Sequence, residues 1–328
     1  MPRISVIMSV FKEPIDWLQQ SIDSILGQTY KDFEFIIVCD NPDYEDGKNV
    51  LNKYAKKDER IKILFNEENI GLTKSLNKAL AVAQGELIAR MDADDISKKE
   101  RFALEVEFME ANPDIDVCHA NIIYVDGKGN VTGERQLEAA KHVEQWLCWE
   151  NPIAHSSVMF KRSLLQKRKL FYNEEYRSAQ DYELWSFLSL EDVKFGYINV
   201  PLLEYRVSEA QVSRSGRPKQ LNNAIIIRRN YIFKRLHKLG VIDSENISVE
   251  DACEALQKND ALFNNKEEVC HILYLFYYHL NRRISLNGIK YLLDRHRLLS
   301  HFGWKQSIYI ILHPFFKSRW NKYNLFAE

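Results

Sequence analysis

The chain has 328 residues, enough for one large domain with an appendage. Apolar residues make up 45% of it and charged residues 28%, which is ordinary for a soluble globular protein and excludes a disordered chain. The formal net charge of -1 excludes a global positive field for nucleic acid, and no nucleic-acid-binding motif is recognisable. The charge is uneven, because residues 1–213 contain 26 Lys and Arg against 36 Asp and Glu, whereas residues 214–240 contain 8 basic residues and no acidic one.

The cysteines and the hydropathy indicate the compartment. Five widely spaced cysteines form no C-x-x-C pair, which favours reduced, structural thiols over zinc or redox chemistry. The N-terminus runs directly into an apolar strand pattern without the layout of a signal peptide, and no apolar stretch approaches the roughly 20 residues that span a bilayer. We therefore expect a cytoplasmic protein, which could lie on the inner face of the cytoplasmic membrane without crossing it.

The first hundred residues alternate between short apolar runs and helical patterns. The apolar runs predict buried strands at residues 4–10, 33–38, 61–65 and 87–91. Helical patterns lie between them, and the clearest cover residues 18–26 and 73–83. This alternation predicts an α/β fold with a mostly parallel sheet and right-handed crossovers.

Beyond Arg101 the pattern is mixed. It predicts a helix to Glu110, a helix from about Asp181, and extended segments at residues 117–124, 156–160 and 200–206. A cluster of breakers at residues 213–218 marks a boundary, and mostly helical patterns follow it. We therefore expect an α/β domain over residues 1–215, with halves of about 1–100 and 101–215, and a helical, basic region over residues 216–328.

Carboxylates follow two of the predicted strands. Asp40 ends the second strand, and Asp92, Asp94 and Asp95 follow the fourth. Ligands bind at this edge of an open α/β sheet. Clustered carboxylates suit Mg²⁺ or Mn²⁺, which bridge to a diphosphate leaving group. The alternatives are a solvated acidic loop or a helix N-cap at the cluster, and an Asx turn at Asp40.

Two further segments contain candidate residues at helix starts. Gly71 permits a close approach of the backbone, and Lys74 lies in the first turn of a predicted helix, where a phosphate could be held. Asp181 opens another helix and could act as a general base. Taken alone, Gly71 is an ordinary glycine before a helix and Asp181 an acid favoured by the helix dipole.

Taken in order, these segments resemble the family 2 glycosyltransferases of the GT-A fold, over roughly residues 4–213. The matching segments are residues 5–11, 24–30, 38–41, 69–77, 91–95 and 180–185. The resemblance implies a GT-A domain with a C-terminal helical extension. It also implies an inverting, metal-dependent hexosyl- or N-acetylhexosaminyltransferase that uses a UDP-sugar.

The resemblance implies roles for individual residues. Asp181 would be the catalytic base, and Asp94, with Asp92 and Asp95 beside it, would hold Mn²⁺ or Mg²⁺. Asp40 would contact the uracil. The nucleotide-sugar would lie against Ser9, Val10, Phe11, Glu13, Asp40, Asn69, Gly71, Lys74, Asp92, Ala93 and Asp94. A single in-line displacement through an oxocarbenium-like transition state would invert the anomeric carbon.

Acceptor contacts are less specific in the sequence. His155 lies in a segment that resembles the acceptor side of the family, and Arg206 and Trp149 are further candidates. An isolated His or Trp is more often part of a core. The chain departs from the family pattern at Cys39, Asn41, Gln180 and Ser208, where the family often has Asp, Gly, Glu and His. Ser213 or Arg214 could compensate for the last of these.

Residues 219–240 and 282–328 combine cations with apolar and aromatic residues. Such segments suit an anionic membrane interface, where a polyprenyl-diphosphate-linked saccharide would be a natural acceptor, as in capsule, O-antigen or exopolysaccharide synthesis. The alternative is a helical subdomain packed on the core.

Two other functions stay open. An NDP-sugar nucleotidyltransferase would normally have a glycine-rich N-terminal loop, and residues 1–20 contain no glycine. A catalytically degenerate nucleotide- or carbohydrate-binding module is the second. Sugar, acceptor and linkage depend on loops that the sequence does not resolve.

Overall fold

A computed structural model describes residues 1–135, 143–147, 150–168, 171–207, 217–238, 240 and 242–244. The chain divides into two compact units, Met1–Ile227 and Arg228–Glu328, and the fold described below is that of the first. None of the helices in the described part is both long enough and apolar enough to cross a membrane. The predicted boundary near residue 215 and the helical character of residues 245–328 stay predictions, and the latter residues lie outside the described part.

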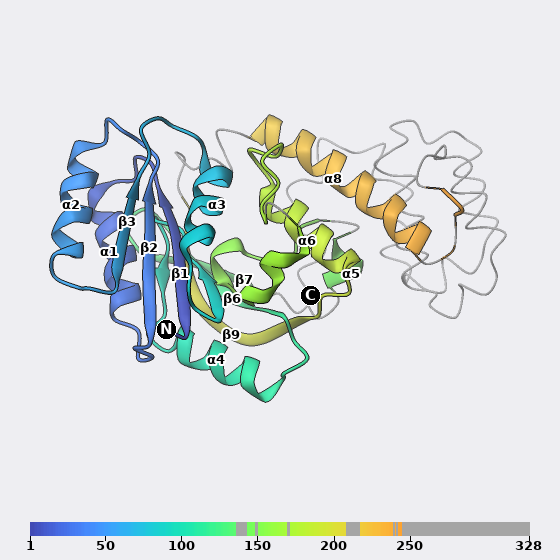
Figure 1. Cartoon of the computed structure of the whole chain (residues 1–328), viewed down its shortest axis with the longest axis horizontal. Coiled ribbons are helices and arrows are strands. Elements are labelled where there is room, and N and C mark those ends of the chain that lie inside the picture. Colours follow the sequence, from blue (N-terminus) through green and yellow to red (C-terminus); the bar gives the residue numbers. More distant parts are fainter. Residues whose placement is uncertain are drawn as a thin grey trace. The chain divides into compact units, whose positions relative to one another are not determined.

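Strands and helices alternate along the first half of the chain (Figure 1). The strands are β1 (Ile4–Val10), β2 (Phe33–Cys39), β3 (Ile61–Phe65), β4 (Leu87–Arg90), β5 (Ile96–Ser97), β6 (Val117–Val125), β7 (Val131–Arg135), β8 (Val158–Lys161) and β9 (Phe195–Arg206). The helices are α1 (Ile15–Leu26), α2 (Glu45–Ala55), α3 (Leu72–Val82), α4 (Arg101–Ala111), α5 (Val143–Trp146), α6 (Gln180–Leu190) and α8 (Arg217–Lys238), with 3-10 helices η2 (His155–Ser157) and η3 (Arg162–Lys167).

The described strands form one sheet in the order β3-β2-β1-β4-β8-β6-β9-β5, with β7 paired to β6. Strands β1 to β4 run parallel. β8 is antiparallel to both β4 and β6, whereas β6 and β9 are parallel. The predicted α/β class is confirmed, and the parallel half ends where the second half of the chain joins the sheet through β8.

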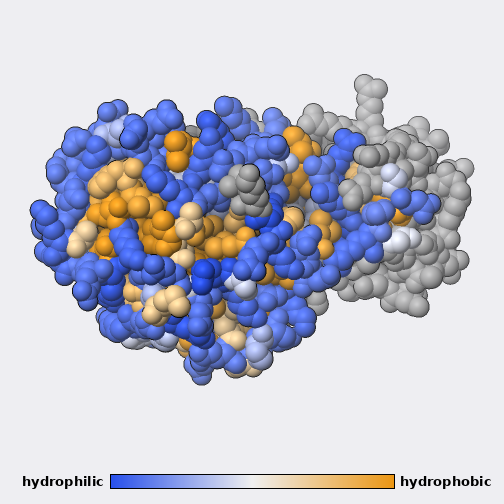
Figure 2. Space-filling view, viewed as in Figure 1, coloured by the Kyte–Doolittle hydropathy of each residue, from blue (hydrophilic) through white to orange (hydrophobic). Residues whose placement is uncertain are grey.

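Alternation along the strands creates two buried faces. On one face, alternate residues of β1 and β2 pack with α1, α2 and α4 in a single core cluster. On the other face α3 packs on β1 and β2. In Figure 2 apolar residues gather over β1–β3 beside α3, and hydrophilic residues surround them. Burial on both faces explains why β1 and β2 are continuous apolar runs.

The structure differs from the expected elements in the second half of the chain. The predicted strand over 156–160 begins only at Val158, because the preceding residues form η2. The predicted extended segment 200–206 is the end of the longer strand β9. The turn at residues 126–130 joins β6 to β7, a strand that the sequence pattern did not predict because it is short and has only one large apolar residue, the exposed Val131.

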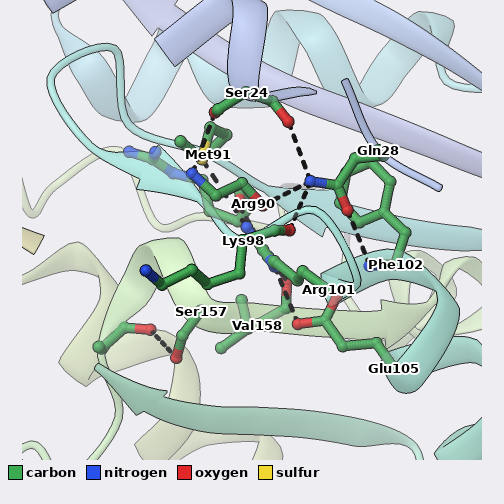
Figure 3. Close-up of polar contacts among 12 residues, drawn as sticks. Ser24, Gln28, Arg90, Met91, Lys98, Arg101, Phe102, Glu105, Ser157 and Val158 are labelled. Carbon is green, nitrogen blue, oxygen red and sulfur yellow. Dashed lines mark hydrogen bonds and ion pairs between the residues drawn. The ribbon is translucent and has the colours of Figure 1, made fainter. Parts of the chain in front are cut away.

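A buried glutamine joins α1 to the segment that follows β4 (Figure 3). Gln28 is fully buried, and its Nε2 donates hydrogen bonds to the carbonyl oxygens of Ser24 at 2.9 Å and Lys98 at 2.7 Å. Its Oε1 accepts the backbone N–H of Phe102 at 3.0 Å. One side chain thus forms hydrogen bonds with backbone groups of three segments. These groups are not paired within a helix or a sheet.

Arg101 extends this network towards β4 and β8 (Figure 3). Its guanidinium donates to the carbonyl oxygens of Arg90 at 3.0 Å and Val158 at 3.2 Å, and to Glu105 Oε1 at 3.0 Å. Arg101 and Glu105 are both fully buried. Burial raises the pKa of Glu105 to about 7, although the Arg101 charge opposes the rise. The network therefore fixes the position of the end of β4.

Replacing Gln28 with Ala should leave the Phe102 N–H buried without a partner, whereas the Lys98 carbonyl keeps the N–H of Arg101 at 3.1 Å. A buried donor without a partner costs about 1–3 kcal/mol, so we expect the free energy of unfolding to fall by about 1–3 kcal/mol. Urea unfolding followed by circular dichroism measures this. Gln166→Ala removes an exposed glutamine and should change the value by less than about 0.5 kcal/mol. Equal losses in the two variants would contradict the role of Gln28.

Candidate active site

The predicted site residues of the first half meet at one edge of the sheet. β1 pairs in parallel with both β2 and β4, so the carboxyl ends of these strands lie side by side. The backbone N–H of Asp40 donates to the Val10 carbonyl at 2.7 Å, just past these ends. Ser9 and Phe11 are partly exposed there, and Val10 is buried between them. This edge is where open α/β sheets bind ligands.

Asp40 is buried, and its carboxylate holds the loop before α3. Oδ1 accepts the N–H of Ile70 at 2.9 Å and Nδ2 of Asn66 at 2.7 Å, and Oδ2 accepts the N–H of Gly71 at 2.8 Å. The sequence reasoning missed Asn66 and this supporting role. The predicted contact of Asp40 with a nucleobase stays a prediction.

Gly71 adopts a backbone conformation that only glycine readily takes. Its φ is +87° and ψ 159°, a region almost confined to glycine. A Cβ at this position would meet nothing within 4 Å, so the space beside it is open. Asn69 and Lys74, on either side, are exposed. Asp40 already accepts hydrogen bonds from the N–H groups of Ile70 and Gly71. A phosphate here would therefore be bound by Lys74 rather than by these amides.

The three carboxylates of the acidic motif after β4, Asp92, Asp94 and Asp95, lie in different environments. Asp92 forms an ion pair with the fully buried Arg90, and Ser156 Oγ donates to its other oxygen. Burial acts to raise the pKa of Asp92, but Arg90, His155 and the Ser156 hydrogen bond together outweigh it, and the pKa lies below its usual value. Asp95 is buried at 1% exposure, whereas Asp94 is partly exposed. Asp92, whose side chain is 31% exposed, and Asp94 therefore both reach the surface, and only Asp95 is enclosed.

Arg206, at the end of β9, holds the backbone of this motif. Its N–H donates to Asp95 Oδ1 at 2.9 Å, and its Nε donates to the Asp94 carbonyl at 2.8 Å. The guanidinium also donates to Gln20 Oε1 at 2.8 Å and lies 4.9 Å from the ring of Trp17. Arg206 is 1% exposed, so this geometry does not support its predicted contact with an acceptor. It connects the two halves of the domain instead.

The carboxylates suit a metal ion whose remaining coordination positions are filled by a bound ligand. Among the described residues no three His, Cys, Asp or Glu side chains are grouped to hold a metal ion. Mg²⁺ commonly takes only one or two protein carboxylates together with substrate phosphates, and the partly exposed Asp94 suits that arrangement. Glu13 lies nearby, and burial raises its pKa to about 7, with further increases from Asp94 and Asp92. Asp92 is bound by Arg90 and Ser156, and Asp95 by the backbone N–H of Arg206.

Asp181 lies at the start of α6 and faces the same region. Asn151 Nδ2 donates to its Oδ2 at 2.7 Å. Burial raises the pKa of Asp181, and the negative charge of Asp92 adds to the rise while Arg90 opposes it. A raised pKa brings a carboxylate closer to the range that suits a general base at neutral pH. The sequence reasoning missed Asn151, and its only signal was the Asn151-Pro152 pair.

His155 belongs to the core of the second half. It is 9% exposed, its Nε2 lies 2.8 Å from the hydroxyl of Tyr172, and its ring contacts those of Tyr172 and Trp185. Burial, with the Arg90 charge, lowers the pKa of His155 well below its usual value, so the imidazole is neutral. The predicted acceptor contact of His155 is not supported by this burial. Trp149, Ser208, Ser213 and Arg214 lie outside the described residues.

The Asp95→Asn substitution should change how stability depends on pH. Burial raises the pKa of Asp95 well above its usual value, and the charges of Asp94 and Asp92 raise it further. The folded chain then keeps a proton that the unfolded chain releases above about pH 4, so the free energy of unfolding falls as the pH rises towards the raised pKa. In Asp95→Asn this fall should be smaller, as measured by urea unfolding in EDTA between pH 4.5 and 7.5.

Asp114→Asn is the matched control for this measurement. Asp114 is 63% exposed and Lys194 lowers its pKa. An exposed ion pair contributes little to stability, so the control should keep a pH dependence close to that of the unmodified chain. An unchanged or steeper fall in Asp95→Asn would contradict the assignment of a buried, protonated Asp95.

Comparison with known proteins places this site in a family. The model of glycosyl transferase family 2 matches residues 5–169. The chain is 38% identical to a glycosyltransferase of Methanocaldococcus jannaschii over 63% of this chain and 71% of that protein. It is 32% identical to the O-antigen biosynthesis glycosyltransferase WbnJ of Escherichia coli over 66% and 84%.

Solved structures share the fold at low identity. TarS of S. aureus in complex with UDP-GlcNAc has a TM-score of 0.58 and 17% identity, over 91% of this chain and 88% of that one. The mannosyltransferase PcManGT of Pyrobaculum calidifontis, in complex with GDP-Man and Mn²⁺, has a TM-score of 0.52 and 16% identity, over 98% and 88%. Both are GT-A glycosyltransferases. The chain therefore belongs to glycosyl transferase family 2 and has the GT-A fold.

Proposed function

We propose that the protein transfers a hexose or N-acetylhexosamine from a UDP-sugar to a hydroxyl of a saccharide, with inversion at the anomeric carbon. One observation carries the proposal: Asp181, held by Asn151 at 2.7 Å, lies within electrostatic reach of Asp92 in the motif after β4. A base on the second half of the domain thus faces the edge at which a nucleotide would lie on the first half.

The transfer needs one proton acceptor and a stabilised leaving group. Asp181 takes the proton of the acceptor hydroxyl, whose oxygen forms the new bond to the anomeric carbon. The bond from that carbon to the diphosphate breaks, and its electron pair leaves with UDP. A divalent metal bound at Asp94 would neutralise charge on the diphosphate. Arg90 and Ser156 keep Asp92 ionised and fixed beside that position.

Neighbouring proteins support the choice of donor and pathway without identifying them. TarS is described with UDP and UDP-GlcNAc, and PcManGT with GDP-Man and Mn²⁺. We favour a UDP-sugar because Asp40 stands where the family contacts uracil. The O-antigen relative favours a role in polysaccharide synthesis. A degenerate binding module or a nucleotidyltransferase is the competing function.

Helix α8 supports a lipid-linked acceptor presented at an anionic membrane surface. In this helix Lys219, Arg229 and Lys234 are exposed, and so is Ile226, at 49%. No acidic residue occurs between residues 214 and 240. Basic residues beside apolar ones suit the headgroup region of anionic lipids. The second basic segment, residues 282–328, lies outside the described residues.

Thermal unfolding with UDP, GDP, CDP or dTDP, each with Mn²⁺ or EDTA, tests the donor site. A ligand that binds only the native state raises the midpoint, so we expect a Mn²⁺-dependent rise with UDP. Asp94→Asn should lose the dependence on Mn²⁺. Asp181→Asn should keep the full rise but lower sugar transfer at least about 100-fold, since base catalysis contributes roughly 10²–10⁴-fold.

The outcomes separate the competing functions. No rise with any nucleotide would refute the transferase and favour a degenerate module. A rise with GDP alone would replace the proposed donor. Unimpaired transfer by Asp181→Asn, followed as UDP release from UDP-sugars, would show that another group is the base.

Flotation on vesicles tests the proposed membrane contact. The full chain should float with phosphatidylglycerol vesicles at low salt and much less with phosphatidylcholine vesicles. The triple change Lys219→Glu, Arg229→Glu and Lys234→Glu should reduce flotation at least about tenfold, since each basic residue contributes roughly 1 kcal/mol. The same number of charges reversed on exposed Lys53, Lys56 and Lys57 should leave flotation nearly unchanged. Equal flotation of both variants would rule out α8 as the contact.

A further inference from the structure

The amide of Asn151 is oriented unambiguously by its two partners. Its Oδ1 accepts the backbone N–H of Ile153 at 3.1 Å, and its other end lies 2.7 Å from Asp181 Oδ2. A backbone N–H can only donate, so the atom facing Ile153 is the oxygen and the atom facing Asp181 is the NH₂ group. Asn151 therefore donates a hydrogen bond to the carboxylate.

The segment that contains Asn151 is constrained by a proline and by its contacts with α6. Pro152 follows it and is buried, and proline restricts the backbone of the residue before it. A second contact ties the same segment to α6, because the hydroxyl of Tyr182 donates to the carbonyl of Leu147 at 2.5 Å. Asp181 and its neighbour Tyr182 are thus both bonded to the stretch between α5 and η2.

We propose that Asn151 is a positioning residue for the base, which holds Oδ2 of Asp181 and leaves Oδ1 to take the proton of the acceptor hydroxyl. The inference rests on the proposed role of Asp181 as the base. The terminal torsion of an aspartate is soft, so without this bond the two oxygens would exchange places. Efficient proton transfer needs one oxygen within about 2.6–3.2 Å of the reacting hydroxyl.

A purely structural role would use only half of the amide. The turn from Asn151 to Ile153 needs the Oδ1 acceptor, which an aspartate also supplies. The bond to Asp181 needs the NH₂ donor, which an aspartate lacks. Asn151→Asp therefore keeps the turn, removes the donor and places a second carboxylate beside Asp181, so the two roles can be separated in one variant.

The charged groups around Asp181 determine the direction in which its pKa should move when Asn151 is replaced. The charged and titratable groups that act on Asp181 are Asp92 and Arg90, from β4 and the loop after it, and Tyr172, from the segment before α6. None of these changes in the variant. A hydrogen bond to an ionised carboxylate lowers its pKa, and a second carboxylate in contact raises it. Since the base must be ionised, Asn151→Asp should move the acidic limb of the kcat profile to higher pH.

The test measures kcat and KM from pH 5 to 9 for Asn151→Asp and Asn151→Ser. We expect the acidic limb to rise by about one pH unit or more in Asn151→Asp and by less in Asn151→Ser. On the acidic side of the limb, where kcat changes tenfold per pH unit, a shift of one unit lowers kcat about tenfold at a given pH. The KM for the donor and the thermal shift with UDP and Mn²⁺ should not change. Asn151→Ser keeps the test possible if the aspartate variant does not fold.

Asn173→Asp is the matched control, because Oδ1 of Asn173 accepts the N–H of Glu175 at 3.1 Å in an equivalent turn. It should leave the acidic limb in place. An unmoved limb in both Asn151 variants, or a loss of kcat at all pH values together with a lower thermal midpoint, would overturn the positioning role. If Asp181→Asn is inactive while the Asn151 variants behave as the unmodified chain, only this inference fails. If Asp181→Asn transfers sugar normally, the proposed function fails with it.

Discussion

The site depends on balancing the mutual repulsion of carboxylates. At the carboxyl edge of the sheet, Asp92 and Asp94 raise the pKa of Glu13 and of Asp95, and Asp92 also raises that of Asp181. Moving an unpaired carboxylate from water into a protein interior costs several kcal/mol. Two buried arginines help in different ways: Arg90 offsets this cost at Asp92 through an ion pair, whereas Arg206 donates its backbone N–H to the Asp95 carboxyl and its Nε to the Asp94 carbonyl. The fold brings these arginines from strands far apart in the sequence.

The same two arginines explain how the domain is joined. β4 carries Arg90 and borders β8, which enters from the second half of the chain, while β9 ends in Arg206. Ser156 donates to Asp92 from the segment before β8. Each connection crosses between the parallel half of the sheet and the mixed half. The acidic motif is therefore one of the places where the two halves are bonded together, and its position at the ligand-binding edge follows from the topology.

The fold was predictable from the sequence where burial leaves a clear pattern. β1, β2 and β4 are buried strands, so their apolar runs and the carboxylates after them were readable. The contacts that assemble the site were not, because they join residues far apart: Asn151 to Asp181, Arg206 to Asp95 and Asn66 to Asp40. Arg90 did leave a signal, since a charged residue at the end of a buried strand needs a partner. His155 was misleading because a single His shows no periodicity that distinguishes a core position from a surface one.

The hydrogen bonds of Asp40 constrain how specificity can diverge. Its two oxygens hold the Ile70 and Gly71 amides and Asn66, so the loop before α3 is ordered by the fold itself and a ligand need not spend binding energy on ordering it. A replacement of Asp40 that altered base recognition would also release this loop. Its neighbours are also tied to the fold, because Cys39 is buried in the core and Oδ1 of Asn41 accepts the N–H of Asp43. Under the proposed contact of Asp40 with the base, folding and selectivity would depend on the same side chain.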